Sequence, residues 1–286
     1  MADRRCATLT IVCPDRPGLV AEVSGLIHRH GGNILAMDQH TDPDRRRFFM
    51  RTVWDLTGFA LDDRALRAAV DALALRFAMT HELRFSDRRE RVAVLASLTP
   101  HCLFDLLQAQ EIGELGGEIV MVISNHEELR RVAEYHGVPF HHVPFNAERR
   151  LQAEAEITRL LGEDAVDLTV LARFMQVLSA DFVAERQARI INIHHSFLPA
   201  FPGNAPYKQA RSRGVKLIGA TAHYVTAELD RGPIIDQDTA RVSHGDSLAD
   251  FLRRGRELER QVLTRAVRCH LERRVLVDDD RTVVFA

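Results

Sequence analysis

The chain has 286 residues, which is enough for one large domain or two ordinary ones. It is 46% hydrophobic and 27% charged, a balance typical of a folded globular protein. Its formal net charge of −2 provides no global field that would attract nucleic acid or an anionic membrane. No run of about 20 apolar residues occurs either. We therefore expect no nucleic-acid partner and no membrane partner.

The four cysteines lie far apart, and no two of them form a Cys-x-x-Cys pair. This spacing argues against a zinc knuckle and against a disulfide framework. Residues 1–6 lead into an alternating segment rather than into the apolar block of a signal peptide. We expect reduced thiols, no metal site and a cytoplasmic protein.

The first 85 residues have a pattern of their own. Apolar residues alternate over residues 7–13, which predicts a strand, and they recur at helical spacing over residues 19–27 until Gly31 and Gly32 end the helix. The order β-α-β-β-α-β predicts a ferredoxin-like domain over residues 1–85. Its remaining elements are two strands over 33–39 and 48–54, a helix capped by Asp62, and a strand over 81–85.

The charged segment 86–91 is the predicted linker. After it, short apolar runs alternate with helix-length segments, which predicts crossover units and an α/β domain with a doubly wound, mostly parallel sheet over residues 92–286. Ser247, with Asp250 three residues later, predicts the start of a long helix near the end of the chain. The apolar runs cover residues 92–95, 119–123, 140–143, 168–171 and 190–193.

Polar side chains lie at the carboxyl end of the last of these predicted strands. Asn192 and His194 are two residues apart, so they point the same way from an extended segment. Open α/β sheets place ligands at the carboxyl ends of their strands. With the downstream carboxylate of Asp230, an amide and an imidazole are the groups needed to act on a carbonyl at neutral pH. The alternatives are an Asx-turn at Asn192, a histidine bonded to backbone at His194 and a turn aspartate at Asp230.

Three segments of this second part resemble the folate-dependent formyltransferases. Residues 192–199 and residues 228–233 look like the catalytic signature of that family, and residues 171–178 look like its folate-binding segment. The tandem His194-His195 is similar to the hydrolytic branch of the family. The resemblance implies hydrolysis of 10-formyltetrahydrofolate to tetrahydrofolate and formate, which supplies formate for purine synthesis. Folate is then the substrate, and no separate cofactor is implied.

The resemblance also implies a role for each site residue. His194 is the general acid/base, Asn192 donates to the oxyanion, and Asp230 orients water or holds the imidazolium. Two further histidines stay open: His195 contacts substrate or bonds to backbone, and His223 lines the pocket or packs in the core. The pterin ring would be bound by the segment Met175, Gln176, Val177 and Leu178, which could otherwise begin an amphipathic helix.

The amino-terminal part resembles an ACT regulatory domain, through residues 13–18 and residues 31–34. An amino-acid effector, glycine or methionine, is implied, and so is a homo-oligomer, because such ligands commonly bind between subunits. The alternative is a domain used only for dimerisation. The effector contacts are expected from Pro17, Gly18, Gly32 and Asn33.

The acceptor of the formyl group is suggested by the loop after the first strand of the second domain. Phosphate cradles depend on glycine, and residues 96–103 contain none, while Pro100 lacks an N–H. This disfavours a phosphorylated amine and favours water. Leu98 stands where many hydrolytic members have lysine. Two rival functions remain: a transferase acting on an amine such as a sugar nucleotide, and a non-catalytic amino-acid sensor.

Overall fold

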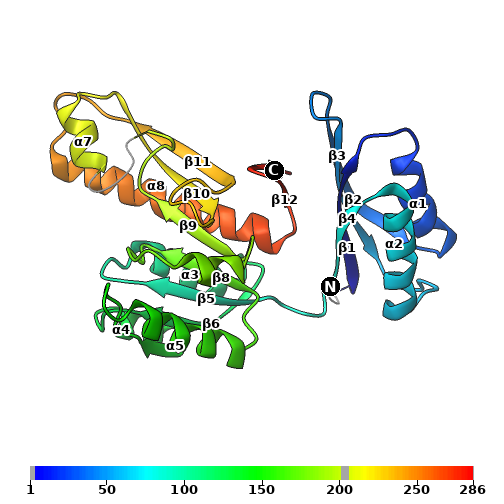
Figure 1. Cartoon of the computed structure of the whole chain (residues 1–286), viewed down its shortest axis with the longest axis horizontal. Coiled ribbons are helices and arrows are strands. Elements are labelled where there is room, and N and C mark those ends of the chain that lie inside the picture. The colour runs from blue at the N-terminus through cyan, green and yellow to red at the C-terminus, as the bar shows by residue number, and fades with distance from the viewer. Residues whose placement is uncertain (1–3, 201–205, 286) are drawn as a thin grey trace. The chain divides into compact units, whose positions relative to one another are not determined.

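The computed structural model describes residues 4–200 and 206–285. The chain forms two compact units (Figure 1). The first contains the chain up to Arg89 together with Arg273–Asp278 and residues 282–285, and the second contains Glu90–Glu272 and Asp279–Arg281.

The first unit has the predicted β-α-β-β-α-β order, and its four-stranded antiparallel sheet has the strand order β2-β3-β1-β4. Asp62 caps α2 through a hydrogen bond from the Ala65 N–H, as the sequence predicts. The ferredoxin-like fold of this part is confirmed. The elements are β1 (Cys6–Pro14), α1 (Leu19–Arg29), β2 (Asn33–Asp42), β3 (Arg47–Asp55), α2 (Asp63–Phe77) and β4 (Thr80–Phe85).

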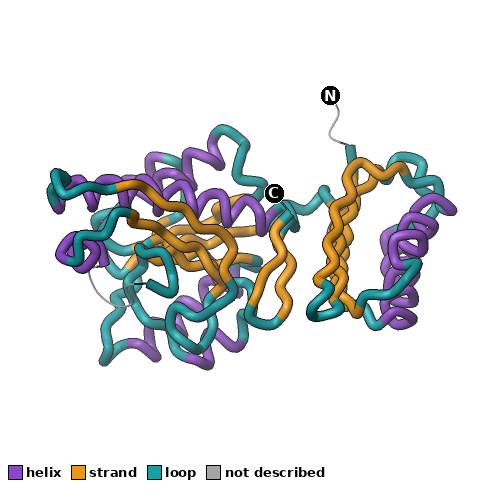
Figure 2. The backbone as a smooth tube through the Cα atoms, turned by 90° about the horizontal axis from the view of Figure 1, so that it is seen from above, coloured by secondary structure: helices purple, strands orange, loops and turns teal. Residues whose placement is uncertain are grey.

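Both helices of the first unit lie on one face of its sheet (Figures 1 and 2). Alternate residues of β1 face them, so that Leu9 and Ile11 enter a core with Trp54. Val12 has the opposite orientation and belongs to a separate small cluster with Phe49. The second face of the sheet therefore also carries apolar side chains that need cover.

That cover comes from the end of the chain, which corrects the domain boundary expected from the sequence. Residues 273–278 and 282–285 were expected in the second domain but pack with the first unit. The strands β12 (Val275–Asp278) and β13 (Arg281–Val284) pair as a hairpin, and Leu276 is buried with Val12 and Phe49. Burial of this apolar side chain is the physical reason for the shift.

The second unit contains a seven-stranded sheet with the order β11-β10-β9-β8-β5-β6-β7. The five strands β5 to β9 pair with one another in parallel, whereas β10 pairs antiparallel with both β9 and β11. The predicted, mostly parallel α/β sheet is therefore confirmed. The strands are β5 (Arg91–Ala96), β6 (Glu118–Ser124), β7 (Phe140–His142), β8 (Leu168–Ala172), β9 (Ile190–His194), β10 (Leu217–Tyr224) and β11 (Ile234–Arg241).

The strand order reverses direction next to β5. From β5 the chain adds β6 and β7 on one side, whereas β8, β9, β10 and β11 follow on the other side. In open α/β sheets, ligands bind outside the carboxyl ends of the strands at such a switch point. The loops that leave β5 and β8 are therefore the expected walls of a site.

Helices cover both faces of this sheet. The longest, α8 (Leu248–Leu271), packs on α3 and on β9, β10 and β11, and it begins with the predicted capping box of Ser247 and Asp250. Among the described helices, none combines the length and the apolar character that crossing a membrane requires. The others are α3 (His101–Glu111), α4 (Arg130–Tyr135), α5 (Arg150–Glu163), α6 (Ala180–Ala184) and α7 (Pro206–Ser212).

Candidate active site

The three residues expected to be catalytic come together at the carboxyl end of β9. Asn192 and His194 lie on this strand, and β10 runs antiparallel beside it, with His223 directly opposite Asn192. Asp230 comes from the loop between β10 and β11. The Nδ1 atom of His194 lies 3.2 Å from Oδ1 of Asp230. Because a carboxylate can only accept, Nδ1 carries the proton and Nε2 is left as the basic nitrogen.

The loop that carries Asp230 is held in an unusual backbone conformation. Asp230 itself has a φ of +56°, a region that aspartate tolerates better than most residues. A Cβ at Gly232 would lie 1.7 Å from the carbonyl oxygen of Tyr224, so only glycine fits there. The hydrogen bond from His194 lowers the pKa of Asp230 against the opposing effect of its partial burial. The acid is therefore ionised and aimed at the imidazole.

His223 positions the amide of Asn192. Its Nδ1 lies 2.9 Å from the carbonyl oxygen of Tyr224, which can only accept, so Nδ1 carries the proton. Its Nε2 then accepts from the Asn192 amide nitrogen at 3.3 Å. Burial lowers the pKa of His223 and favours this neutral form. The side chain of His223 is thus both buried and part of the site. Lining the pocket and packing in the core, the two alternatives for this residue, are not exclusive.

A pocket lies beside these groups. It is lined by Asn192, His223 and Asp230, and on another side by the three residues Gln176, Val177 and Leu178. These three form a loop after β8 rather than the start of a helix, because α6 begins only at Ala180, after the N-cap Ser179. Met175, expected with them, is not among the lining residues, and it is 57% exposed with a φ of +59°.

His195 lies beside the His194–Asp230 pair and is not part of it. Its ring centroid is 5.3 Å from that of His194 and 6.1 Å from that of Tyr207. Burial and the nearby Arg173 guanidinium lower the pKa of His195 to about 4. This second imidazole is therefore neutral at physiological pH.

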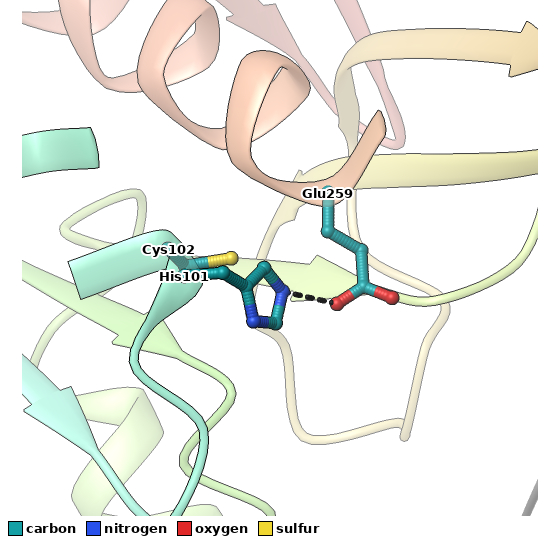
Figure 3. Close-up of side chains that lie close together, drawn as sticks. All are labelled: His101, Cys102 and Glu259. Carbon is teal, nitrogen blue, oxygen red and sulfur yellow. Dashed lines mark hydrogen bonds and ion pairs between the residues drawn. The ribbon is translucent and has the colours of Figure 1, made fainter. Parts of the chain in front are cut away.

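A buried polar cluster next to His195 was not expected from the sequence. Glu259 of α8 is 1% exposed and accepts a hydrogen bond from the Tyr207 hydroxyl at 2.9 Å. It also accepts one from Nε2 of His101 at 2.8 Å (Figure 3). Burial opposes ionisation of Glu259, but the hydrogen bond from His101 and the charge of Arg173 outweigh it and lower its pKa. A Cβ at Gly255 would lie 2.3 Å from the Tyr207 ring, so this glycine lets the ring reach Glu259.

The cluster also contains atoms that a metal could use. The ligand atoms of His101, Cys102 and Glu259 lie within 4.8 Å of one another (Figure 3). However, burial raises the pKa of the Cys102 thiol well above its usual value, and Nε of Arg173 lies 3.4 Å from Glu259. A divalent cation there would meet a protonated thiol and a guanidinium. These residues therefore suit a hydrogen-bonded Glu259 carboxylate better than a metal.

The expected effector residues do not come together within one copy of the chain. Pro17 and Gly18 precede α1, whereas Gly32 and Asn33 follow it. The helix has 11 residues, which separates the two pairs by about 16 Å. Gly18 has a φ of +93°, and a Cβ at Gly32 would lie 2.6 Å from the side chain of Ile27. Both positions therefore favour glycine for structural reasons, apart from any effector.

Comparison with known proteins agrees with this architecture. A family model described as formyl transferase matches residues 90–267, and one described as ACT domain matches residues 7–75. A formyltetrahydrofolate deformylase from Synechocystis is 50% identical over 280 residues, 98% of each chain.

Solved structures of the same family are also similar to this chain. A formyltetrahydrofolate deformylase from Pseudomonas syringae has a TM-score of 0.97 at 46% identity and covers 100% of this chain and 96% of its own. Glycinamide ribonucleotide transformylase 1 from Symbiobacterium toebii has a TM-score of 0.65 at 33% identity, covering 72% of this chain and 98% of its own. The latter similarity extends over less of the chain. On both sequence and structure, the chain belongs to the formyltetrahydrofolate deformylase family.

Proposed function

We propose that this chain hydrolyses 10-formyltetrahydrofolate to tetrahydrofolate and formate, with His194, Asp230 and Asn192 as its catalytic residues. The assignment of these residues rests on the contact between Nδ1 of His194 and Oδ1 of Asp230 at 3.2 Å. Beside this contact lies a pocket lined by Asn192 and by Gln176–Leu178. The metabolic role that follows is to supply formate for purine synthesis and to return tetrahydrofolate to the folate pool.

In the first step, Nε2 of His194 removes a proton from water, and Asp230 stabilises the imidazolium that forms. The resulting hydroxide adds to the formyl carbon. The amide N–H of Asn192 that is not used by His223 donates to the oxyanion of the tetrahedral intermediate.

In the second step, the imidazolium of His194 gives its proton to N10 as the C–N bond breaks. Formate leaves as the anion, and one proton is released to solvent. The pterin ring occupies the pocket beside Gln176, Val177 and Leu178, whose backbone offers donors and acceptors to a flat heterocycle. The folate is the substrate, and we propose no separate cofactor.

The test is a product assay with purified protein and 10-formyltetrahydrofolate in the absence of any amine. Formate and tetrahydrofolate are expected in equal amounts. Formyl transfer to an added amine, with no formate in its absence, would favour a transferase. Binding of the folate without turnover would favour a sensor.

We also propose that glycine or methionine regulates the enzyme through the ACT domain of a homo-oligomer. The two pairs Pro17-Gly18 and Gly32-Asn33 lie at opposite ends of α1, so a small amino acid that contacts both needs a second copy of the chain. Hydrolysis rates and sedimentation, each measured with and without glycine and methionine, test this. The cytoplasm, where the cysteines stay reduced, is the proposed location.

A further inference from the structure

Arg173 occupies a position where its side chain is costly. It directly follows β8 at the switch point of the sheet, and its φ is +62°, in the left-handed region that favours glycine. Leu171 is the partner of Asn192 in the adjacent strand β9, so the ends of β8 and β9 reach the same edge. Arg173 therefore leaves the sheet beside the catalytic histidine.

The guanidinium is surrounded by protein but not satisfied by it. The side chain is only 16% exposed, and its Nε lies 3.4 Å from Oε2 of Glu259. Among the described residues, however, neither Nε nor Nη1 has a hydrogen-bond partner. The oxygens of Glu259 accept from Tyr207 and His101 instead. Unpaired donors on a buried cation are costly, which points to a ligand that accepts from them.

Other unpartnered atoms occur in residues that contact Glu259 and His195, the neighbours of this guanidinium. His194 leaves Nε2 and His101 leaves Nδ1 without a partner within the described part of the chain, and both atoms are buried. Arg173 acts electrostatically on His195, whose ring contacts that of His194. The unused donors of Arg173 therefore belong to the same polar region as the catalytic imidazole.

We propose that the guanidinium of Arg173 binds the formate product in a subsite next to His195 and the His101–Glu259 pair. This inference rests on the proposed function, which generates a small monocarboxylate at His194. A guanidinium binds a carboxylate through charge-assisted N–H···O bonds, and Nη1 of Arg173, which has no partner among the described residues, can donate one. Glu259, already hydrogen-bonded to Tyr207 and His101, holds Arg173 through the ion pair with Nε and leaves Nη1 for the ligand.

The proposal is tested by titrating carbon-13-labelled formate into the full chain and following its resonance by NMR, with tetrahydrofolate present and no turnover. Arg173→Gly is the test variant, because glycine suits the backbone there, and its melting temperature reports whether it folds. We expect formate affinity to fall at least tenfold. Formate inhibition of hydrolysis should weaken by the same factor, and Arg173→Lys should retain part of the affinity.

Arg46→Gly is the matched control. Arg46 also has a positive φ, of +53°, but belongs to the first unit, and its replacement is expected to leave formate affinity unchanged. Unchanged formate affinity in a folded Arg173→Gly variant would overturn the proposal, as would displacement of formate by equal chloride. Since the titration needs no turnover, a wild-type chain that binds formate but does not hydrolyse the folate would count against the proposed function alone.

Discussion

Asn192 is the residue whose proposed role depends most directly on a neighbour. His223 accepts from its amide at 3.3 Å, which leaves one N–H for the proposed contact with the oxyanion. Asn192→Ala is therefore expected to lower kcat about 100-fold or more with little change in KM, because the donor acts mainly in the transition state. Steady-state kinetics measure both constants. A raised KM at unchanged kcat would make Asn192 a binding residue only.

His195 should affect how stability depends on pH. Its pKa is about 4 in the folded chain, below the ordinary value, because burial and Arg173 disfavour the charged form. As pH falls below about 6.5, the unfolded chain takes up a proton at this residue that the folded chain does not, so stability is lost toward pH 4. His195→Gln is expected to reduce the fall in melting temperature between pH 7 and pH 5. An identical fall in both proteins would contradict this assignment.

At this scale, local spacing predicted Asn192 and His194 but missed Arg173 and Glu259. The first pair stands at the end of one strand, where alternation alone places both side chains on one side. Glu259 lies among charged residues of α8, and its neighbours in space come from other elements. One signal was available: with Phe251, Leu258 and Val262 it falls on the buried stripe of the helix.

Among the elements, the loop between β10 and β11 matters most for the site. A side chain at Gly232 would collide with the Tyr224 carbonyl, so Gly232→Ala should move the loop and separate Asp230 from His194. We expect at least a tenfold loss of hydrolysis together with a lower melting temperature.

Gly162→Ala is the matched control for that substitution. Gly162 lies in α5, and a Cβ there would meet nothing within 4 Å, so alanine should raise stability by up to about 1 kcal/mol and leave hydrolysis unchanged. Equal effects of the two substitutions on activity would show that the Asp230 loop is not constrained by Gly232.

Element prediction succeeded where a signal is local and failed where the partner is remote. Ser247 and Asp250 are three residues apart, so their capping box was visible in the sequence. The hairpin of β12 and β13 consists of two four-residue strands whose apolar contacts, Val12 and Phe49, lie more than 200 residues away. No local pattern could assign it to the first unit.

For the whole molecule, the end of the chain is expected to stabilise the first unit. Asp278 is buried and accepts from Nε and Nη2 of Arg47 at 3.0 and 2.7 Å, so it pairs the terminal hairpin with the start of β3. Asp278→Asn should lower the free energy of unfolding by about 1–2 kcal/mol while leaving hydrolysis intact. Chemical denaturation and the product assay measure the two effects. No loss of stability would mean that the pair contributes little.

The central claim is that His194 and Asp230 act as one unit on a formyl group carried by folate. The most direct measurement is the rate of formate release from 10-formyltetrahydrofolate by wild type, His194→Ala, Asp230→Ala and the double variant. We expect at least a hundredfold loss for His194→Ala, and little further loss in the double variant, because the two residues share one step. Near-normal formate release by His194→Ala would contradict the account.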